Sequence, residues 1–178
     1  VVPVWGAYIG DGRMMASADS SAMGILVFTA LSFGALMWAY LQSDFSVVNV
    51  WQNSHSDMPT LFKITGTWGN HEGSMLLWVL ILALFAAAVS VFGGNLPERL
   101  RANVQGVQAW MLATFFAFII WTSNPFARQP TAIEGQDLNP ILQDIGLASH
   151  PPMLYLGYVG FSITFAFAIA ALLEGRID

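Results

Sequence analysis

The sequence of 178 residues contains no cysteine and few charged side chains, and both shortages limit what the protein can do. Without a thiol, the chain forms no disulfide, no thiolate metal site and no thioether link of its own. Only 10% of the residues are charged, whereas soluble domains have about 25%. Hydrophobic residues make up 56% of the chain, so the composition predicts a membrane protein.

Positive charge is especially scarce. Six Lys and Arg stand against eleven Asp and Glu, which gives a net charge of −5. No cluster of basic residues can bind a phosphate backbone, and this excludes nucleic acid as a partner. A glycine-rich phosphate loop and a serine nucleophile elbow are also missing. Because the chain starts at Val1 without the pattern of a signal peptide, we expect a processed, split or partial piece of a longer protein.

Four apolar windows are long enough to cross a bilayer, which takes about 20 residues in an α-helix. None of them contains Asp, Glu, Lys, Arg or His. Lipid offers no partner for backbone N–H and C=O groups, so each window is expected to be helical. The windows are 22–41, 74–92, 104–121 and 153–173. The sequence therefore predicts an all-α integral membrane protein in which residues 1–178 form one membrane domain, itself part of a larger transmembrane bundle.

The connections between the windows differ in length and charge. The second and third windows are joined by a short link, whereas the other two connections are long loops. Four basic residues lie on the side of the termini and the short link, and two lie in the long loops; they are Arg13, Arg99, Arg101 and Arg176 against Lys63 and Arg128. The positive-inside rule then places the termini in the cytoplasm and the long loops outside. Aromatic and aliphatic residues recur in these loops, which predicts short amphipathic helices on the outer surface.

The end of the second long loop carries a helix-start signal. Asn139 is a good cap, and Pro140 suits the first helical position. Gly146 is typical of a helix end, so we predict a short helix that stops there. This helix would lie on the outer face and lead the chain to His150.

His150 stands in the stretch LASHPPMLYLGYVGF, directly before two prolines. Pro151 disfavours the α conformation for the residue before it, so we expect an extended His150 with Pro151 and Pro152 in the first turn of the last membrane helix. The positive end of the helix dipole favours a neutral imidazole there, as a metal ligand requires. The residues alone leave two interpretations open: a helix-cap histidine bonded to backbone or water, or a ligand.

Two further groups of residues are candidates. Tyr155 and Tyr158 belong to one aromatic side of the last window, which suits either a flat apolar ligand or ordinary helix packing. The stretch TWGNHEGSMLLW holds His71 and Glu72 just before the second window, with no third ligand for a metal site. A polar helix start, in which Glu72 complements the dipole, is the alternative interpretation. His55 lies in a polar loop and is expected to be solvated.

Several stretches are specific enough to indicate a family. WGNHEGSMLLWVL, TSNPF, DFSVVNVWQNS and the block from Glu134 to Asp178 resemble cytochrome c maturation protein F, of the haem-handling integral membrane family. The similarity covers essentially the whole chain in order. It implies a haem lyase component of the bacterial inner membrane, or of the mitochondrial inner membrane as the alternative. Such a protein takes b-type haem from the chaperone CcmE and acts with CcmH/CcmI-type subunits. It joins the haem to the Cys-x-x-Cys-His motif of apocytochrome c on the outer side.

The resemblance also implies roles for individual residues. His150 corresponds to an outward-facing axial ligand of the haem iron, with Tyr155 and Tyr158 as its neighbours. Trp68, His71 and Glu72 belong to a family motif without a defined role.

A tryptophan-rich segment, a second outer histidine and the ligands of a structural haem are expected outside this sequence. The chain is thus expected to be an N-proximal fragment or split-gene product, inactive without the remaining part. A scaffold subunit that only delivers haem is the alternative function. An ion-translocating subunit is disfavoured by the uncharged windows.

Overall fold

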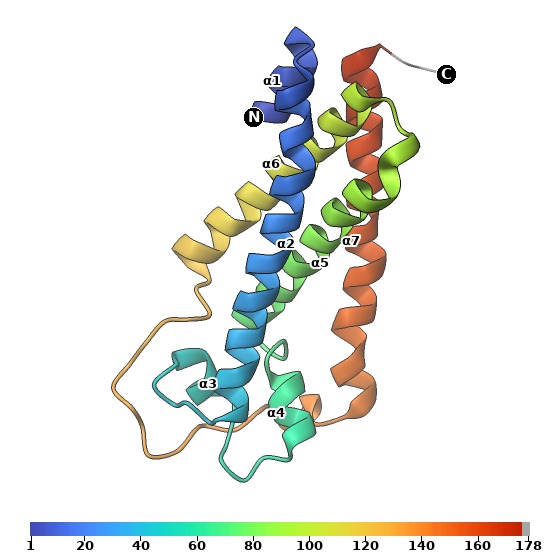
Figure 1. The fold of residues 1–178 in the computed structure, drawn as a ribbon. Coiled ribbons are helices and arrows are strands. Elements are labelled where there is room, and N and C mark those ends of the chain that lie inside the picture. Colours follow the sequence, from blue (N-terminus) through green and yellow to red (C-terminus); the bar gives the residue numbers. More distant parts are fainter. Residues whose placement is uncertain (176–178) are drawn as a thin grey trace.

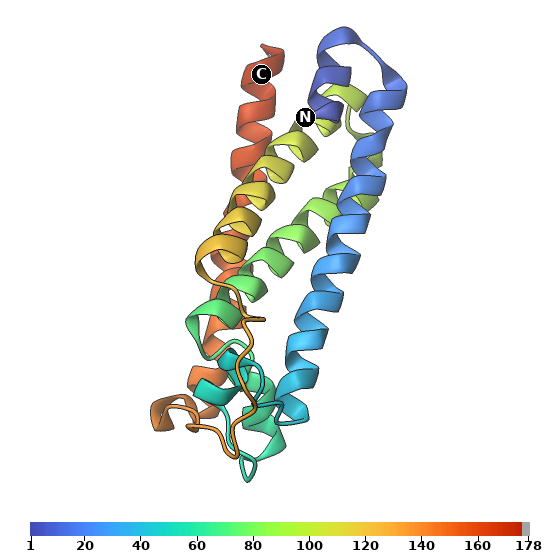
Figure 2. The same ribbon diagram turned by 90° about the vertical axis from the view of Figure 1, so that its left-hand side faces the viewer.

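A computed structural model describes residues 1–175, and Figure 1 shows its arrangement of helices. Four long helices lie side by side, with the short elements at their ends, as the view in Figure 2 also shows. The elements are α1 (Val2–Ile9), α2 (Gly12–Leu41), α3 (Val48–Asn53), α4 (Thr60–Gly66), α5 (His71–Phe92), η1 (Gly93–Asn95), α6 (Glu98–Thr122), η2 (Pro140–Leu142) and α7 (Ile145–Glu174). Within residues 1–175 every element of regular secondary structure is a helix, which confirms the predicted all-α class.

Four of these helices, α2, α5, α6 and α7, are long and apolar enough to cross a membrane. Each contains one of the predicted windows, so the four predicted long apolar helices are confirmed. The helices are longer than the windows because their ends carry polar caps and charged turns. α2 begins at Gly12 rather than Ala22, where the Asp11 side chain accepts hydrogen bonds from the backbone N–H groups of Arg13 and Met14.

The first helix, α1, was not predicted from the sequence. It is too short to span a bilayer and ends at Gly10, whose positive φ of 77° closes the helix in the left-handed conformation. α1 packs against α2 and α6. Gly106 of α6 permits this approach, because a Cβ added there would lie 2.1 Å from Cγ2 of Val4.

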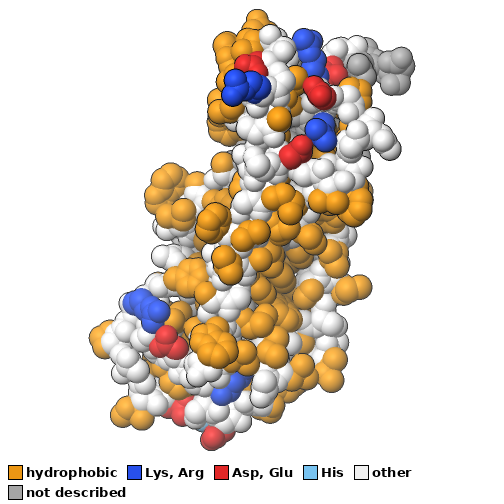
Figure 3. Space-filling model, viewed as in Figure 1, with side chains coloured by type: hydrophobic (Ala, Val, Ile, Leu, Met, Phe, Trp, Pro, Cys, Tyr) orange, Lys and Arg blue, Asp and Glu red, His pale blue; other side chains and the backbone are white. Residues whose placement is uncertain are grey.

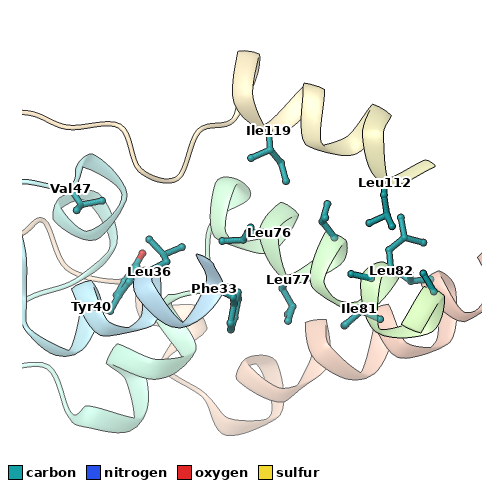
Figure 4. Packing of buried hydrophobic residues seen from close by; sticks show 14 of the residues in the cluster. Phe33, Leu36, Tyr40, Val47, Leu76, Leu77, Ile81, Leu82, Leu112 and Ile119 are labelled. Atoms are coloured by element: carbon teal, nitrogen blue, oxygen red, sulfur yellow. The ribbon is translucent and has the colours of Figure 1, made fainter. Parts of the chain in front are cut away.

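The apolar core lies between the long helices, as the close-up in Figure 4 shows for part of it. Its fully buried members come from several helices and include Leu36 of α2, Leu82 of α5 and Leu112 of α6. Side-chain amides of α6 add polar links. Gln105 donates to the Ala86 carbonyl at 2.9 Å, and Gln108 donates to the Ser162 hydroxyl at 3.3 Å. Such hydrogen bonds fix neighbouring helices where lipid cannot compete for the donor.

Charged side chains gather toward the two ends of the molecule, and apolar side chains cover the face between them (Figure 3). At the end with the N-terminus, Arg101 pairs with Asp19 at 3.2 Å. At the other end, Arg128 pairs with Asp44 at 3.0 Å. Arg176, which we counted for the orientation of the chain, lies outside the described residues. This distribution suits a membrane protein, since the apolar face matches the hydrocarbon layer.

The two long loops meet at the end opposite the N-terminus, which we call the loop end (residues 42–70 and 123–144). Val48 donates its backbone N–H to the Ala127 carbonyl at 2.9 Å, and Gln136 donates to the Trp51 carbonyl at 2.7 Å. Leu138 is 2% exposed and packs beside Gly69. The loops therefore brace each other, and the first contains the short helices α3 and α4.

Glu134 links the two loops through hydrogen bonds that favour its charged form. Its carboxylate accepts hydrogen bonds from the Ser56 hydroxyl at 2.5 Å and from the backbone N–H groups of Ser56 and Gly135. The Ser56 hydroxyl is the main cause that lowers the pKa of Glu134 from 4.5 to about 2. A carboxylate with a lowered pKa in the folded state stabilises the fold above its unfolded pKa, and this stabilisation is lost as it protonates.

We therefore expect faster proteolysis of the loop end as the pH falls from 4.5 toward 2. The variant Glu134→Gln should show a shallower rise in this window, since it cannot titrate. Some rise should remain, because hydrogen bonds led by the Ser46 hydroxyl also lower the pKa of Asp44. Limited proteolysis at a series of pH values, with an acid-stable protease, measures both curves. Equal curves for the two proteins would exclude the role of Glu134.

Candidate functional site

His150 lies in the second turn of α7 at the loop end, and its side chain is exposed. The predicted extended conformation is wrong, because α7 starts at Ile145 and continues through His150. The helix starts early since the Asp144 side chain caps it by accepting a hydrogen bond from Leu147 N–H at 3.0 Å. No hydrogen bond to the imidazole is present within residues 1–175. The cap interpretation is therefore wrong for the helix that actually forms, because Asp144 occupies the cap position.

Pro151 and Pro152 consequently lie inside α7 rather than in its first turn. The predicted helix from Asn139 to Gly146 is also wrong in extent. Asn139 does cap a turn, accepting from Ile141 N–H at 3.1 Å, but this turn is the short 3₁₀ element η2. Gly146 does not end a helix, because Asp144 has already started the next one.

Trp68 lies in the turn between α4 and α5 and contacts the start of α7. Its indole N–H donates to the Ala148 carbonyl at 2.8 Å. The same ring stacks on Phe33 of α2, with centroids 6.3 Å apart and planes 18° from parallel. Trp68 therefore links α7 to α2 close to His150.

The start of α5 is fixed by a buried hydrogen-bond network. Asn70 caps the helix by accepting from Gly73 N–H at 2.8 Å. Asn49 of α3 donates to the Asn70 side chain at 2.7 Å and to the Glu72 carboxylate at 3.3 Å. The Tyr40 hydroxyl of α2 donates to the Asn49 side chain at 2.7 Å. Glu72 thus lies in the first turn, as the polar helix-start interpretation predicts, and also joins α5 to α3 through Asn49.

The network around Tyr40 and Asn49 was not predicted from the sequence. Asn70 carried a local signal, since an Asn directly before a helix is a typical cap. Tyr40 and Asn49 carried none, because their role depends on how the first loop folds back. Both serve structure in the described chain: they hold α2, α3 and α5 together.

His71 is the first residue of α5 and is exposed. Its Nδ1 lies 3.4 Å from the Ser123 hydroxyl, and its ring meets Phe118 edge-on at 6.2 Å. His71 therefore contacts the end of α6, whereas His150 lies on α7. No hydrogen bond or ring contact joins these two histidines within residues 1–175. The described part also holds no group of three or more His, Asp or Glu that could bind a metal ion.

His55, expected to be solvated, is half-exposed. Its Nε2 lies 3.9 Å from the Glu134 carboxylate, and its Nδ1 accepts from Asp57 N–H at 3.2 Å. An accepting Nδ1 leaves the proton of the neutral ring on Nε2, toward Glu134. His55 is thus part of the bracing between the loops.

The two candidate tyrosines differ in their surroundings. The Tyr155 hydroxyl hydrogen-bonds to Ser74 of α5, and its ring meets Trp78 at 5.0 Å. Tyr158 is 66% exposed, and its hydroxyl makes no hydrogen bond within residues 1–175. Tyr155 therefore fixes α7 to α5, whereas Tyr158 presents its ring at the surface.

This difference predicts separate effects on stability. Tyr155→Phe should lower the free energy of unfolding by about 1 kcal/mol, since it removes an interhelical hydrogen bond. Tyr158→Phe should leave stability unchanged. Thermal unfolding of both variants in detergent measures the difference. An equal loss in both variants would contradict the distinct surroundings of the two rings.

The site as a whole offers one exposed imidazole on a helix that is fixed at two points. Trp68 holds α7 before His150, and Ser74 and Trp78 hold it after His150 through Tyr155. Such an arrangement can supply one ligand to an iron that receives its other ligands elsewhere. Within residues 1–175 no group of three or more His, Asp or Glu completes a metal site there.

Comparison with known proteins gives this site a context. The cytochrome C assembly protein family matches residues 68–177. The cytochrome c-type biogenesis protein CycK of Rhizobium meliloti (strain 1021) is 61% identical over 100% of this chain and 26% of its own length. CcmF of Escherichia coli (strain K12) is 47% identical over 100% of this chain and 28% of its own. The chain thus spans about a quarter of the length of these relatives.

A solved structure agrees with the relatives. "Cytochrome c Heme Lyase CcmF" superposes with a TM-score of 0.85 at 27% identity, over 98% of this chain and 27% of that one. The predicted resemblance is therefore confirmed by sequence and by fold. The family match starts at Trp68 and includes both His71 and His150. The chain belongs to the cytochrome c assembly protein family.

Proposed function

We propose that this chain forms part of a cytochrome c haem lyase and that His150 supplies one axial ligand to the iron of the incoming haem. The observation that carries the proposal is the exposed imidazole of His150 on a helix fixed at both sides. Membership of a cytochrome c assembly family supports haem as the substrate. Imidazole is one of the side-chain groups that ligate haem iron, and it can do so only where its ring nitrogen is not already bonded.

The surface next to His150 fits a flat apolar substrate. Residues four, eight and eleven positions after His150 share its side of α7. They are Leu154, Tyr158 and Phe161, with exposed fractions of 37%, 66% and 71%. A haem whose iron binds His150 would cover part of this surface. The residues present therefore fit haem as a substrate, with the second axial ligand supplied from outside residues 1–178.

The mechanism requires orientation more than acid–base chemistry. When bound, the haem supplies the two vinyl groups to which the thiols of Cys-x-x-Cys-His in apocytochrome c add. The chain described here has no cysteine and supplies no thiol. Its part is to hold an imidazole at a fixed place and to present an apolar surface that excludes water from the bound ring system.

We infer the orientation and partners from the same features. Arg13, Arg99 and Arg101 lie at the end opposite the loop end, which favours the cytoplasm for that end and the periplasm for the loop end. Bacterial relatives support a location in the inner membrane. The proposed partners are the chaperone CcmE, CcmH/CcmI-type subunits, apocytochrome c and the remaining part of a CcmF-type protein.

A reconstituted assembly tests the proposed function. The complete protein, purified with its haem chaperone and an apocytochrome c, should form thioether-linked haem when supplied with reduced haem. Haem that stays bound to the protein but is never attached would indicate a delivery scaffold instead. Denaturing gels stained for covalent haem separate these two results.

A further inference from the structure

The carbonyl of Ala148 lacks both backbone donors that a helix normally offers. In an α-helix this carbonyl would accept from the N–H of residue 152, and in a 3₁₀ turn from that of residue 151. Both residues are proline, which has no N–H. Ala148 is half-buried, and an unpaired buried carbonyl is costly. The two prolines therefore create a vacant acceptor two residues before His150.

Trp68, from another part of the chain, donates a hydrogen bond to this carbonyl. Its indole N–H donates to the Ala148 carbonyl at 2.8 Å, eighty positions away in the sequence. The indole is itself held, because it is half-buried and stacks on Phe33, which is 8% exposed. The hydrogen bond thus ties the start of α7 to the core of the bundle.

From these contacts we infer that Trp68 is a positioning residue for His150, an inference that rests on the proposed function of His150 as a haem ligand. No hydrogen bond or ring contact joins Trp68 to the imidazole within residues 1–175. Trp68 fixes the backbone two residues before His150, at the carbonyl from which Pro151 and Pro152 have removed both helical donors. Replacing a residue that orients a metal ligand without touching the metal typically lowers metal affinity or activity by about 10–100-fold. Trp68 would orient His150 in the same way.

The test compares matched variants of the complete haem-binding protein. Trp68→Phe keeps an aromatic ring and removes the N–H donor. Trp51→Phe is the control, because Trp51 is also a half-buried indole at the loop end and its N–H makes no hydrogen bond in the described chain. The measurements are the affinity for ferrous haem and the share of low-spin, six-coordinate iron in the absorption spectrum.

We expect Trp68→Phe to weaken haem binding about tenfold and to reduce the low-spin share, with Trp51→Phe close to the unaltered protein. The double variant Trp68→Phe/Pro152→Ala gives the sharpest result. Alanine at 152 restores the backbone N–H that can reach the Ala148 carbonyl, so the indole donor becomes unnecessary and binding should return. This rescue holds even if Trp68→Phe alone fails to fold, in which case the double variant should fold and bind haem.

The remaining outcomes separate the inference from the proposed function. If His150→Ala weakens binding and Trp68→Phe does not, the inference fails and the proposed function stands. A double variant that remains as weak as Trp68→Phe, or remains unfolded, also overturns the inference. If His150→Ala leaves binding and spectrum unchanged, the proposed function fails and the inference fails with it. Adding Trp68→Phe to His150→Ala should cause no further loss, because the two residues act through one ligand.

Discussion

Replacing His150 by Ala in the complete protein should lower the yield of covalently attached haem at least about tenfold. Replacing a residue that only orients a metal ligand already lowers activity by about 10–100-fold, so loss of the ligand itself should cost no less. The exposed imidazole is the only nitrogen ligand on this face of α7 in the described chain. Under the proposed function, its loss would leave the incoming iron with one protein ligand fewer and the haem free to rotate on the apolar surface. The measurement is haem staining of the cytochrome produced, normalised to the amount of lyase in the membrane.

His55→Ala is the matched control for this experiment. His55 is a half-exposed histidine at the same end of the molecule, and it contacts Glu134 of the second loop instead of facing outward on α7. Its replacement should leave the haem yield within about twofold of normal, since surface substitutions away from a site change little. A His150→Ala protein that supports normal yield would remove the ligand role.

Replacing Gly73 by Ala should destabilise the protein by about 3 kcal/mol, the upper range for an overpacked site. A Cβ at this position would lie 1.7 Å from the Thr67 carbonyl oxygen and 2.9 Å from its carbon. These are backbone atoms of a buried residue, so no side-chain rotation relieves the clash. The turn that carries Trp68 and the capped start of α5 would have to shift. Thermal unfolding in detergent measures the change.

Gly34→Ala provides the control for the same chemical change. Gly34 lies in α2, and an added Cβ would meet nothing within 4 Å. Alanine is the better helix former, so this variant should be unchanged or up to about 1 kcal/mol more stable. A Gly73→Ala protein as stable as Gly34→Ala would show that the α4–α5 turn does not pack as described.

The membrane spans could be predicted from the sequence because their signal is local. A bilayer requires about 20 apolar residues in one stretch, and composition alone reveals such a stretch. The ends of the helices were harder to predict from the sequence. The Pro-Pro pair after His150 is typical of a first turn, yet Asp144 starts the helix earlier. The prolines are tolerated inside α7 because Trp68 supplies the missing donor from eighty positions away.

The contacts that shape the candidate site could not be predicted for the same reason. The sequence singled out His150, Trp68 and Tyr155 as candidates. It did not predict that Trp68 and Tyr155 hold α7 on either side of His150. Those contacts depend on how the helices pack, which no local pattern encodes. The family resemblance, in contrast, depended on long specific stretches and was confirmed across the chain.

The most direct test of the account is chemical rescue of a cavity at position 150. His150→Gly in the complete protein should lose the low-spin signal of the added substrate haem and covalent haem attachment, and millimolar imidazole should restore both, because free imidazole can occupy the place of the missing side chain. Imidazole should have no such effect on a His55→Gly protein. A His150→Gly protein in which the added haem becomes low-spin and is attached without imidazole would contradict the proposal that His150 ligates the incoming iron.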